Sequence, residues 1–271
     1  MISARTDGQP ARTEEPYWSV ELEELHHETS RTSFIDVWTR TAMIERLGQL
    51  TAGMRIIDIG CSAGYLLDDL ARREAGLHLV GVDYLLAGLQ SARSRLSGAL
   101  VVQADACHLP VVGDCADAIV SANLLEHVPD DVGALGEMRR TLRPGGRAVV
   151  VVPSAPGTYD YFDRYLHHQR RYGRGELRAK AESAGLSVVE HVYLGSFLFP
   201  PFWLLKKKNR VMFDHLDGAS LRRKVVNSIS LTKDSRLGKI ACRLERWLLS
   251  HHVGLPFGIR ELAILEKSGA A

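Results

Sequence analysis

Hydrophobic residues after Arg55 fall in short runs that alternate with longer amphipathic segments. The runs are rich in Val, Ile and Leu and include RIIDI, HLVGVD and RAVVVVP. The segments between them space their apolar residues three to four positions apart, which is the period of a helix with one buried face. This alternation predicts an α/β fold, in which crossover helices connect the strands of a doubly wound, Rossmann-like and mostly parallel sheet.

Seven strands and four connecting helices are predicted from this pattern. The strands lie at residues 55–59, 78–83, 99–105, 117–123, 147–153, 186–194 and 259–267. The helices lie at residues 65–74, 85–96, 132–142 and 174–185. The third helix is expected to end before Pro144, and Gly185 is the kind of residue that ends the fourth.

The remaining segments suggest how the chain is organised. Residues 1–16 are polar, contain Pro and Gly, and are expected to be flexible. Residues 17–48 are predicted to be helical but stand outside the alternation. The cofactor-binding domain is predicted over residues 49–271, with a helical cap inserted at about 195–257 rather than a second domain.

Composition narrows the class of protein. The chain has 271 residues, of which 45% are hydrophobic and 24% charged, and its formal net charge is +2. This balance predicts an ordinary globular core and no general attraction to nucleic acid. We see neither a signal peptide nor a run long enough to cross a bilayer, and the four cysteines lack zinc-site spacing. These features favour a cytoplasmic protein.

The most informative segment is DIGCSAG at residues 58–64, which follows the first strand and opens a helix. Gly60 permits a sharp turn there, and Gly64 permits close helix packing. Asp83 ends the second strand, where a carboxylate can accept both ribose hydroxyls. A nicotinamide dinucleotide would favour the spacing G-x-G-x-x-G, whereas this loop has G-x-x-x-G preceded by Asp58. Such a carboxylate suits a ligand with an ammonium group better than a pyrophosphate.

The ordered motifs DIGCSAG, GVD, QADACHLP, IVSANLLEHVPD and LRPGG resemble those of class I S-adenosylmethionine-dependent methyltransferases of the small-molecule type. Ser62 departs from the glycine that is most common in the middle of the loop. The resemblance implies a seven-stranded sheet whose last strand is antiparallel, and S-adenosyl-L-methionine as cofactor, released as S-adenosyl-L-homocysteine. The cofactor-binding residues it implies are Asp58, Gly60, Cys61, Ser62 and Gly64 for the methionine end, Asp83 and Tyr84 for the ribose, Asp105 and Ala106 for the adenine, and Asn123 and Leu124 beneath the cofactor.

Candidate catalytic residues come from the loop after the fifth predicted strand, residues 154–177, which is rich in Tyr, His and Arg. His168 is the first candidate for a general base, followed by His167 and Tyr159. His127, next to Glu126, is a further candidate, because the resemblance to methyltransferases places it near the methyl-donor end of the cofactor. An alternative is that the histidines and arginines of the loop only stabilise its shape. No metal is predicted, because the His-His pairs at 26–27, 167–168 and 251–252 point apart and no HExxH motif occurs.

Residues 197–210, FLFPPFWLLKKKNR, combine an apolar stretch with a basic end. Three interpretations stay open: a lid over an apolar acceptor, a peripheral contact with membrane lipid through Phe197–Arg210, and a helix that packs on the sheet with a solvated charged end.

The sequence therefore predicts a methyltransferase that acts on a small, apolar, natural-product or lipid-linked acceptor, at oxygen in preference to carbon or nitrogen. A nucleic acid partner is not expected, because no basic face with interleaved aromatic residues appears. The alternative is a protein that keeps the cofactor-binding fold but catalyses a reaction without methyl transfer, such as a cyclisation.

Overall fold

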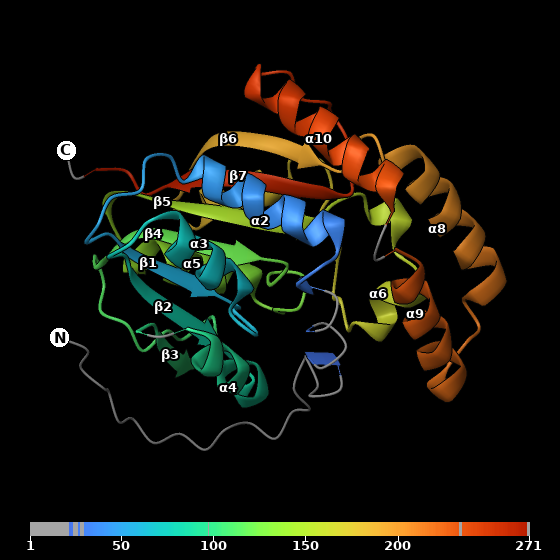
Figure 1. The fold of residues 1–271 in the computed structure, drawn as a ribbon, viewed down its shortest axis with the longest axis horizontal. Helices are drawn as coiled ribbons and strands as arrows, with labels where there is room; N and C mark the ends of the chain where they lie inside the picture. Colours follow the sequence, from blue (N-terminus) through green and yellow to red (C-terminus); the bar gives the residue numbers. More distant parts are fainter. Residues whose placement is uncertain (1–21, 24–26, 28–29, 97, 233–234, 270–271) are drawn as a thin grey trace.

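A single seven-stranded sheet forms the centre of the protein in the computed structural model (Figure 1). The structure describes residues 22–23, 27, 30–96, 98–232 and 235–269, so the prediction for residues 1–16 lies outside the described part. The strand order is β3-β2-β1-β4-β5-β7-β6. All neighbouring pairs are parallel except those of β7, which runs antiparallel to both β5 and β6. The predicted fold class, including the antiparallel last strand, is confirmed.

Most element bounds agree with the hydrophobic pattern. The strands are β1 (Arg55–Ile59), β2 (His78–Asp83), β3 (Leu100–Gln103), β4 (Ala116–Ala122), β5 (Leu142–Pro153), β6 (Ser187–Leu194) and β7 (Arg260–Glu266). The helices are α2 (Phe34–Arg46), α3 (Tyr65–Arg73), α4 (Leu86–Arg95), α5 (Asp131–Thr141), α6 (Tyr161–Tyr165), α7 (Glu176–Ser183), α8 (Phe199–Phe213), α9 (Gly218–Thr232) and α10 (Arg236–Ser250), with a 3₁₀ turn η1 (Pro156–Thr158).

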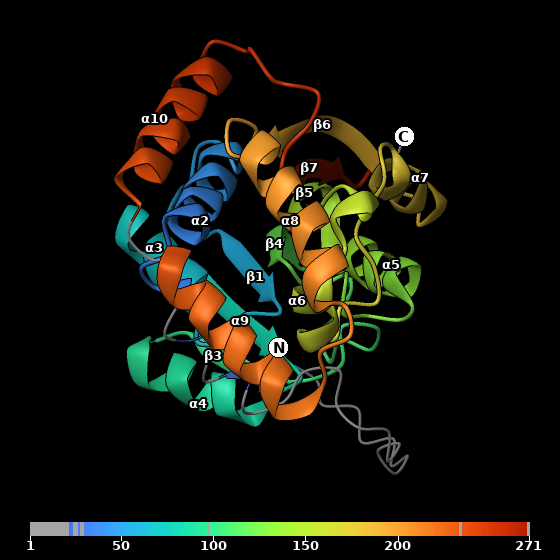
Figure 2. The same cartoon turned by 90° about the vertical axis from the view of Figure 1, so that its right-hand side faces the viewer.

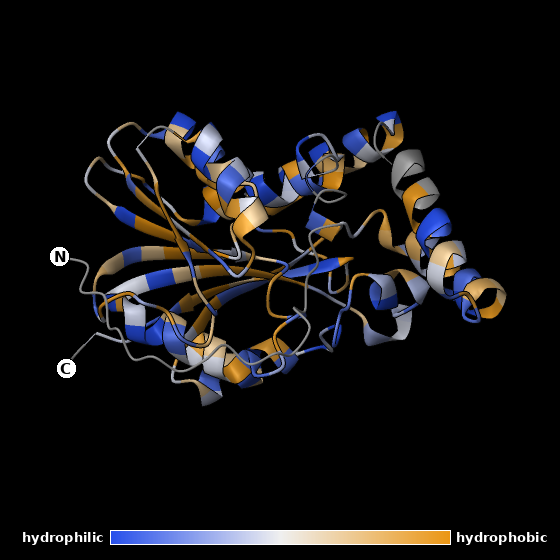
Figure 3. Cartoon of the chain, turned by 90° about the horizontal axis from the view of Figure 1, so that it is seen from below, coloured by the Kyte–Doolittle hydropathy of each residue, from blue (hydrophilic) through white to orange (hydrophobic). Residues whose placement is uncertain are grey.

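Helices cover both faces of the sheet and divide the core in two. Side chains of α2, α3 and α4 join one cluster of buried residues, and those of α5 and α7 join the other. The strands contribute to both clusters because alternate residues of a strand point to opposite faces. Figure 3 shows the result, with largely hydrophobic strands enclosed by helices that turn hydrophilic residues outward.

Two predicted segments differ in extent from the structure. β5 begins at Leu142 rather than at residue 147, because Leu142 pairs with Ala116 and the backbone of Gly145 and Gly146 hydrogen-bonds to Lys267. In the predicted helical segment 17–48, the described residues 22, 23, 27 and 30 are helical, a turn follows at residues 31–32, and α2 then begins at Phe34, with Trp38, Ala42 and Met43 buried against the sheet.

Three helices, α8, α9 and α10, fill the connection between β6 and β7. Figures 1 and 2 show α8 and α9 beyond the carboxyl ends of the parallel strands, together with α6, while α10 lies along α2. Among the described residues, no helix is long and apolar enough to cross a membrane. The fold thus leaves the carboxyl edge of the sheet facing a helical layer, and that edge is where parallel α/β sheets bind ligands.

Candidate active site

The loop between β1 and α3 has the backbone conformation that its glycines predict. Gly60 and Gly64 have φ values of +81° and +75°, in the left-handed region that favours glycine. A side chain at Gly60 would lie 3.1 Å from the Cβ of Leu124, and one at Gly64 would lie 3.0 Å from the Cβ of Ala92 in α4. Both glycines therefore allow close packing, Gly60 against the residue after β4 and Gly64 against α4.

Asp83, at the end of β2, is tied to this loop by its carboxylate. One oxygen accepts a hydrogen bond from the Ser62 backbone N–H at 2.8 Å, and the other accepts one from the Leu85 N–H at 2.9 Å. The pKa of Asp83 is raised to about 6. Burial is the main cause and the nearby Glu23 carboxylate adds to it, while the two backbone hydrogen bonds act in the opposite direction. Each oxygen keeps a second lone pair, so the group can still accept hydrogen bonds from two ligand hydroxyls.

Asp58, in β1, is buried with 2% of its surface exposed and lines a cavity at the edge of the sheet. Burial, and then the charge of Asp83, raise the pKa of Asp58 to about 8. A buried carboxyl group with a raised pKa is stabilised in its charged form by a nearby cation. The position fits the sequence prediction that Asp58 faces an ammonium group, directly or through water.

The cavity is lined at its base by Gly60, Cys61 and Ser62 and closed by Asn123 after β4. Ser30 and the α2 residues Asp36, Thr39 and Arg40 lie on its other side, as does Arg260 of β7. Its volume is about 70 Å³, whereas pockets that hold drug-sized ligands measure roughly 300–1,000 Å³. A nucleoside therefore needs more room than this conformation provides.

Glu23 does not line this cavity, but it is buried beside the glycine loop and accepts a hydrogen bond from the Ser62 hydroxyl. A Cβ at Gly88 of α4 would lie 2.7 Å from the Glu23 carboxylate. Glu23 thus lies between the glycine loop and α4, beside Asp83. It is a site residue that the sequence analysis did not identify, since nothing in its local pattern distinguishes it from other acidic residues.

The predicted adenine residues lie farther out. Asp105 is half-exposed, accepts a hydrogen bond from the Cys107 N–H at 2.9 Å, and has its carboxylate 3.4 Å from the His108 ring. Ala106 is buried, and Tyr84 is 47% exposed. Of the predicted cofactor residues, Asp58, Gly60, Cys61, Ser62 and Asn123 line the cavity, whereas Gly64, Asp83, Tyr84, Asp105, Ala106 and Leu124 do not.

His168, in the segment after β5, is oriented by a carboxylate that was not identified from the sequence. Its Nδ1 donates a hydrogen bond of 2.9 Å to Asp163 of α6, which leaves Nε2 as the ring nitrogen available to a ligand. Burial lowers the pKa of His168, in opposition to the hydrogen bond from Nδ1 to Asp163. Burial alone would raise the pKa of Asp163, but His168, Arg171 and Lys206 hold it well below its usual range.

Asp163 belongs to a buried charge network that joins α6 to α8. Arg171 donates a hydrogen bond of 2.7 Å to Asp163, and Lys206 contacts both Asp160 at 2.6 Å and Asp163 at 3.2 Å. The basic end of residues 197–210 is therefore not wholly solvated, because Lys206 is 6% exposed. The spacing of Asp160 and Asp163 was visible in the sequence, but their cation comes from α8, more than forty residues later.

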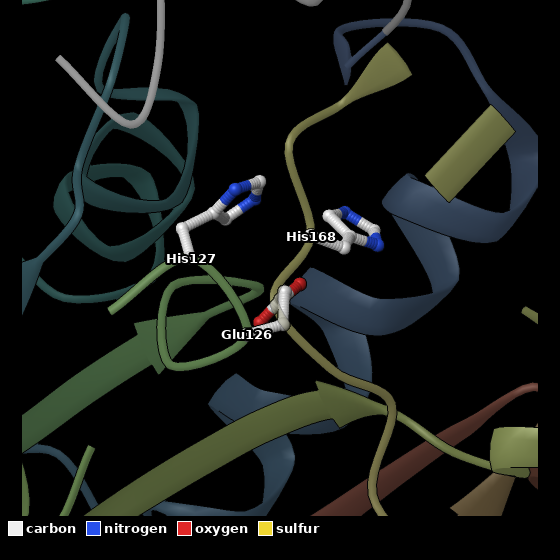
Figure 4. Close-up of side chains that lie close together, drawn as sticks. All are labelled: Glu126, His127 and His168. Carbon is white, nitrogen blue, oxygen red and sulfur yellow. The ribbon is translucent and has the colours of Figure 1, made fainter. Parts of the chain in front are cut away.

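His127 lies against His168, with ring centroids 4.7 Å apart and nearly perpendicular planes. Glu126 beside it is 1% exposed, and neither carboxylate oxygen has a hydrogen-bond partner among the described residues. Burial raises the pKa of Glu126 to about 8. Figure 4 shows the three side chains converging from two segments of the chain. Glu126 was not among the catalytic residues predicted from the sequence, and the structure groups it with His127 and His168.

The other two candidates for a base are not brought into this cluster. The hydroxyl of Tyr159 donates a hydrogen bond of 2.8 Å to the backbone carbonyl of His168, and burial raises the pKa of Tyr159. These features suit a residue that holds the loop in shape. His167 is exposed, with a φ of +55°. Arg170 contacts Asp131 at 2.7 Å, and Arg171 contacts Asp163 at 2.7 Å. Both arginines therefore have the loop-stabilising role that the sequence left open.

Known proteins with similar sequences or folds point to one family. A family model described as a methyltransferase domain matches residues 57–150. A protein of Mycolicibacterium smegmatis described as a probable S-adenosylmethionine-dependent methyltransferase is 30% identical over 151 residues, which are 53% of this chain and 56% of that protein. A ubiquinone biosynthesis O-methyltransferase of Aeromonas salmonicida is 35% identical over 154 residues, 50% of this chain and 64% of that one. These matches span less than two thirds of the length of each relative.

The fold has counterparts among solved structures. Phosphoethanolamine N-methyltransferase 2 of Haemonchus contortus, crystallised with S-adenosyl-L-methionine, superimposes with a TM-score of 0.61 at 17% identity, over 95% of this chain and 58% of that one. At this identity the likeness concerns the arrangement of the sheet and helices.

Proposed function

We propose that this chain is a class I S-adenosylmethionine-dependent methyltransferase, and that it transfers a methyl group from S-adenosyl-L-methionine to a hydroxyl oxygen of a small, apolar acceptor. The observation that carries the proposal is the arrangement of two sites on one edge of the sheet. The glycine loop follows β1 and is tied to Asp83 at the end of β2, while His127 follows β4 and packs against His168 from the segment after β5.

The residues present fit the cofactor. Asp83 offers two carboxylate oxygens to the ribose hydroxyls, held in place by backbone N–H groups. Asp58 offers a buried carboxyl group to the ammonium of the methionine end, and the absence of a side chain at Gly60 lets a ligand approach the backbone. When bound, the cofactor supplies an electrophilic methyl group on a sulfonium. The protein must then hold the acceptor in line with that group, which is the main part of such catalysis.

His168 supports an oxygen acceptor because its side chain is only 9% exposed and its Nδ1 is hydrogen-bonded to Asp163, which leaves Nε2 to accept the proton of an acceptor hydroxyl. Oxygen also fits the similarity to a ubiquinone biosynthesis O-methyltransferase.

An apolar, lipid-associated acceptor is supported by the exposed faces of α8 and α10. Four residues spaced three to four positions apart on α10, Leu237, Ile240, Leu244 and Trp247, are 46–79% exposed. On α8, Trp203, Leu204, Leu205, Val211 and Met212 are exposed as well. Residues 199–250 also contain twelve Lys and Arg against four Asp and Glu. Helices with an exposed apolar stripe and basic flanks bind the surface of anionic membranes.

Of the three interpretations of residues 197–210, we therefore favour the membrane contact, extended to α10. Sedimentation with vesicles of anionic and of zwitterionic phospholipid tests it. Wild-type protein is expected to bind only the anionic vesicles. The double variant Leu244→Glu/Trp247→Glu is expected to bind them at least 10-fold more weakly, since each apolar side chain buried in the membrane contributes about 1.5–3 kcal/mol. Val189→Glu, at an exposed position of β6, is the matched control. Equal binding by all three proteins would contradict the contact.

The function itself is tested by calorimetric titration with S-adenosyl-L-homocysteine, followed by product analysis. Wild-type protein is expected to bind in the micromolar range and Asp83→Asn to bind at least 10-fold more weakly, because a charged acceptor is replaced by a neutral amide. A product heavier by one methyl group supports transfer. An acceptor of unchanged mass with a new ring would instead support the cyclisation alternative.

A further inference from the structure

The geometry points to a divalent metal site formed by Glu126, His127 and His168. One ligand atom from each side chain lies within 4.8 Å of those of the other two, although the residues come from two segments forty residues apart (Figure 4). We propose that this site binds a first-row transition cation such as Zn²⁺. Two imidazole nitrogens and one carboxylate oxygen form a set of three protein ligands that leaves a fourth position open.

The first support is the unsatisfied carboxylate of Glu126. The side chain is almost fully buried, yet neither oxygen has a hydrogen-bond partner among the described residues. A buried polar group without a hydrogen-bond partner loses its hydration without compensation and destabilises the fold. Native structures rarely keep such a group without a function or an unobserved ligand. A cation between Glu126 and the two imidazoles would satisfy it.

Glu126 also has no direct ion pair among the described residues, although the charges of Arg260 and Arg171 act on it and lower its pKa. Arg171 is paired with Asp163, Lys206 with Asp160 and Asp163, and Arg260 with Asp36 at 2.6 Å. Each nearby cationic side chain in the described part of the chain thus has its own carboxylate. A divalent cation is the kind of ligand that this remaining acidic group would attract.

The second support is the hydrogen bond between His168 and Asp163. Histidines that bind metals almost always donate their other ring N–H to a carboxylate or carbonyl, which sets the tautomer and orients the ring. Here Nδ1 donates to Asp163, and the buried network of α6 and α8 holds that carboxylate in place. Nε2 is therefore the deprotonated nitrogen that a cation requires.

Binding would draw the three side chains together by modest rotations, because zinc bonds of about 2.0–2.1 Å bring tetrahedral ligand atoms closer than 4.8 Å. The open position is where the acceptor hydroxyl would be held. A bound cation lowers the pKa of that hydroxyl, so its proton passes to water. The oxygen then forms the bond to the methyl carbon as the carbon–sulfur bond breaks. This role rests on the proposed function, and it makes His168 a metal ligand instead of a general base.

Metal binding is tested without any acceptor, by calorimetric titration of chelator-treated protein with Zn²⁺ and by the visible absorption of added Co²⁺. Wild-type protein is expected to bind one equivalent, with a Co²⁺ band typical of four-coordinate sites. Glu126→Gln and His127→Ala are expected to weaken Zn²⁺ binding at least 10-fold and to remove the band. Glu126→Gln keeps the size and shape of the side chain, so its fold can be verified by thermal unfolding.

The matched controls are His108→Ala, which removes the exposed histidine beside Asp105, and His252→Ala, which alters an exposed His-His pair. Both are expected to leave binding unchanged. The inference is overturned if wild-type protein binds no Zn²⁺, or if the controls abolish binding while Glu126→Gln does not. Binding of S-adenosyl-L-homocysteine, measured on the same samples, reports on the cofactor site separately. Failure of the metal proposal can therefore be distinguished from failure of the proposed function.

Discussion

The two halves of the candidate site are built in different ways. The cofactor half depends on contacts among residues near the ends of neighbouring strands. The Ser62 N–H donates a hydrogen bond to Asp83, and Gly64 packs on α4. The acceptor half depends on buried charges from distant segments, since Asp163 of α6 meets Lys206 of α8. The first is specified by backbone geometry and the second by side-chain electrostatics. Mutations should therefore affect them by different mechanisms and largely independently.

The largest effect is expected for Asp163→Ala, which leaves Arg171 and Lys206 without this buried carboxylate. Breaking a buried ion pair from one side costs about 3–5 kcal/mol, so the free energy of unfolding should fall by that amount in chemical denaturation. The affinity for S-adenosyl-L-homocysteine should change less than about threefold, because distant sites behave additively. Asp214→Ala, which breaks the exposed pair with Arg164, is the control and should cost no more than about 1 kcal/mol. A parallel loss of cofactor binding in Asp163→Ala would show that the halves are coupled.

Gly64→Ala is the corresponding change in the cofactor half. The alanine must adopt a φ near +75° and approach Ala92, so the free energy of unfolding should fall by about 1–2 kcal/mol. Affinity for S-adenosyl-L-homocysteine should fall as well, while Zn²⁺ binding stays unchanged. The control is Gly136→Ala in α5, where the new methyl group meets no atom within 4 Å and the helix should gain up to about 1 kcal/mol. Equal effects of the two changes would contradict the role of the left-handed turn.

Asp58→Asn separates stability from binding. The pKa of Asp58 rises from 3.8 to about 8 on folding, so between these values the folded state holds a proton that the unfolded state has lost. Wild-type stability attributable to this group must therefore fall as pH rises from about 4 to about 8. The melting temperature of Asp58→Asn, relative to wild type, should increase across this window, by about 2–4 °C for each 1 kcal/mol. Thermal unfolding at pH 5 and pH 8 checks this.

The same variant should bind S-adenosyl-L-homocysteine more weakly, by about 10-fold or more, because the ammonium group loses a charged partner. Stabilisation without any loss of affinity would show that Asp58 does not face the ammonium.

The smallest effect is expected for Tyr159→Phe, which removes one hydrogen bond to the His168 carbonyl. The free energy of unfolding should fall by about 0.5–1.5 kcal/mol in chemical denaturation. Methyl transfer should persist, because the hydroxyl holds the loop and does not take a proton. Loss of transfer with unchanged stability would restore Tyr159 as a candidate base.

Sequence patterns predicted the fold and much of the cofactor half. The strands β1 and β2 have the predicted bounds, and Asp58, Gly60 and Ser62 line the cavity as expected. These features are local, because a parallel sheet brings the carboxyl ends of neighbouring strands to one edge whatever the rest of the chain does. The pattern could not predict that β5 begins at Leu142, since that start depends on two hydrogen bonds with Lys267 near the far end of the chain: the Gly145 N–H donates to the Lys267 carbonyl, and the Lys267 N–H donates to the Gly146 carbonyl.

The acceptor half was predicted only as a loop rich in polar residues. His168 and His127 were identified as separate candidates. The prediction of no metal was based on adjacent His-His pairs and on sequence motifs, and the Zn²⁺ titration tests it. Lys206 was read as part of a solvated or membrane-facing basic run, although it is buried against Asp160 and Asp163. Glu23, beside the cofactor loop, carried no local signal at all.

The sequence by itself determined the order of strands and helices along the chain, the glycine turn, and the two carboxylates near the ends of β1 and β2. Alternating burial and left-handed turns are properties of short segments. Only the tertiary structure decided which charges meet. Glu126, His127 and His168 converge, and Asp163 finds Lys206, because α6 and α8 pack beyond the carboxyl edge of the sheet. Buried electrostatic contacts depend on distance in space, and separation along the chain does not encode that distance.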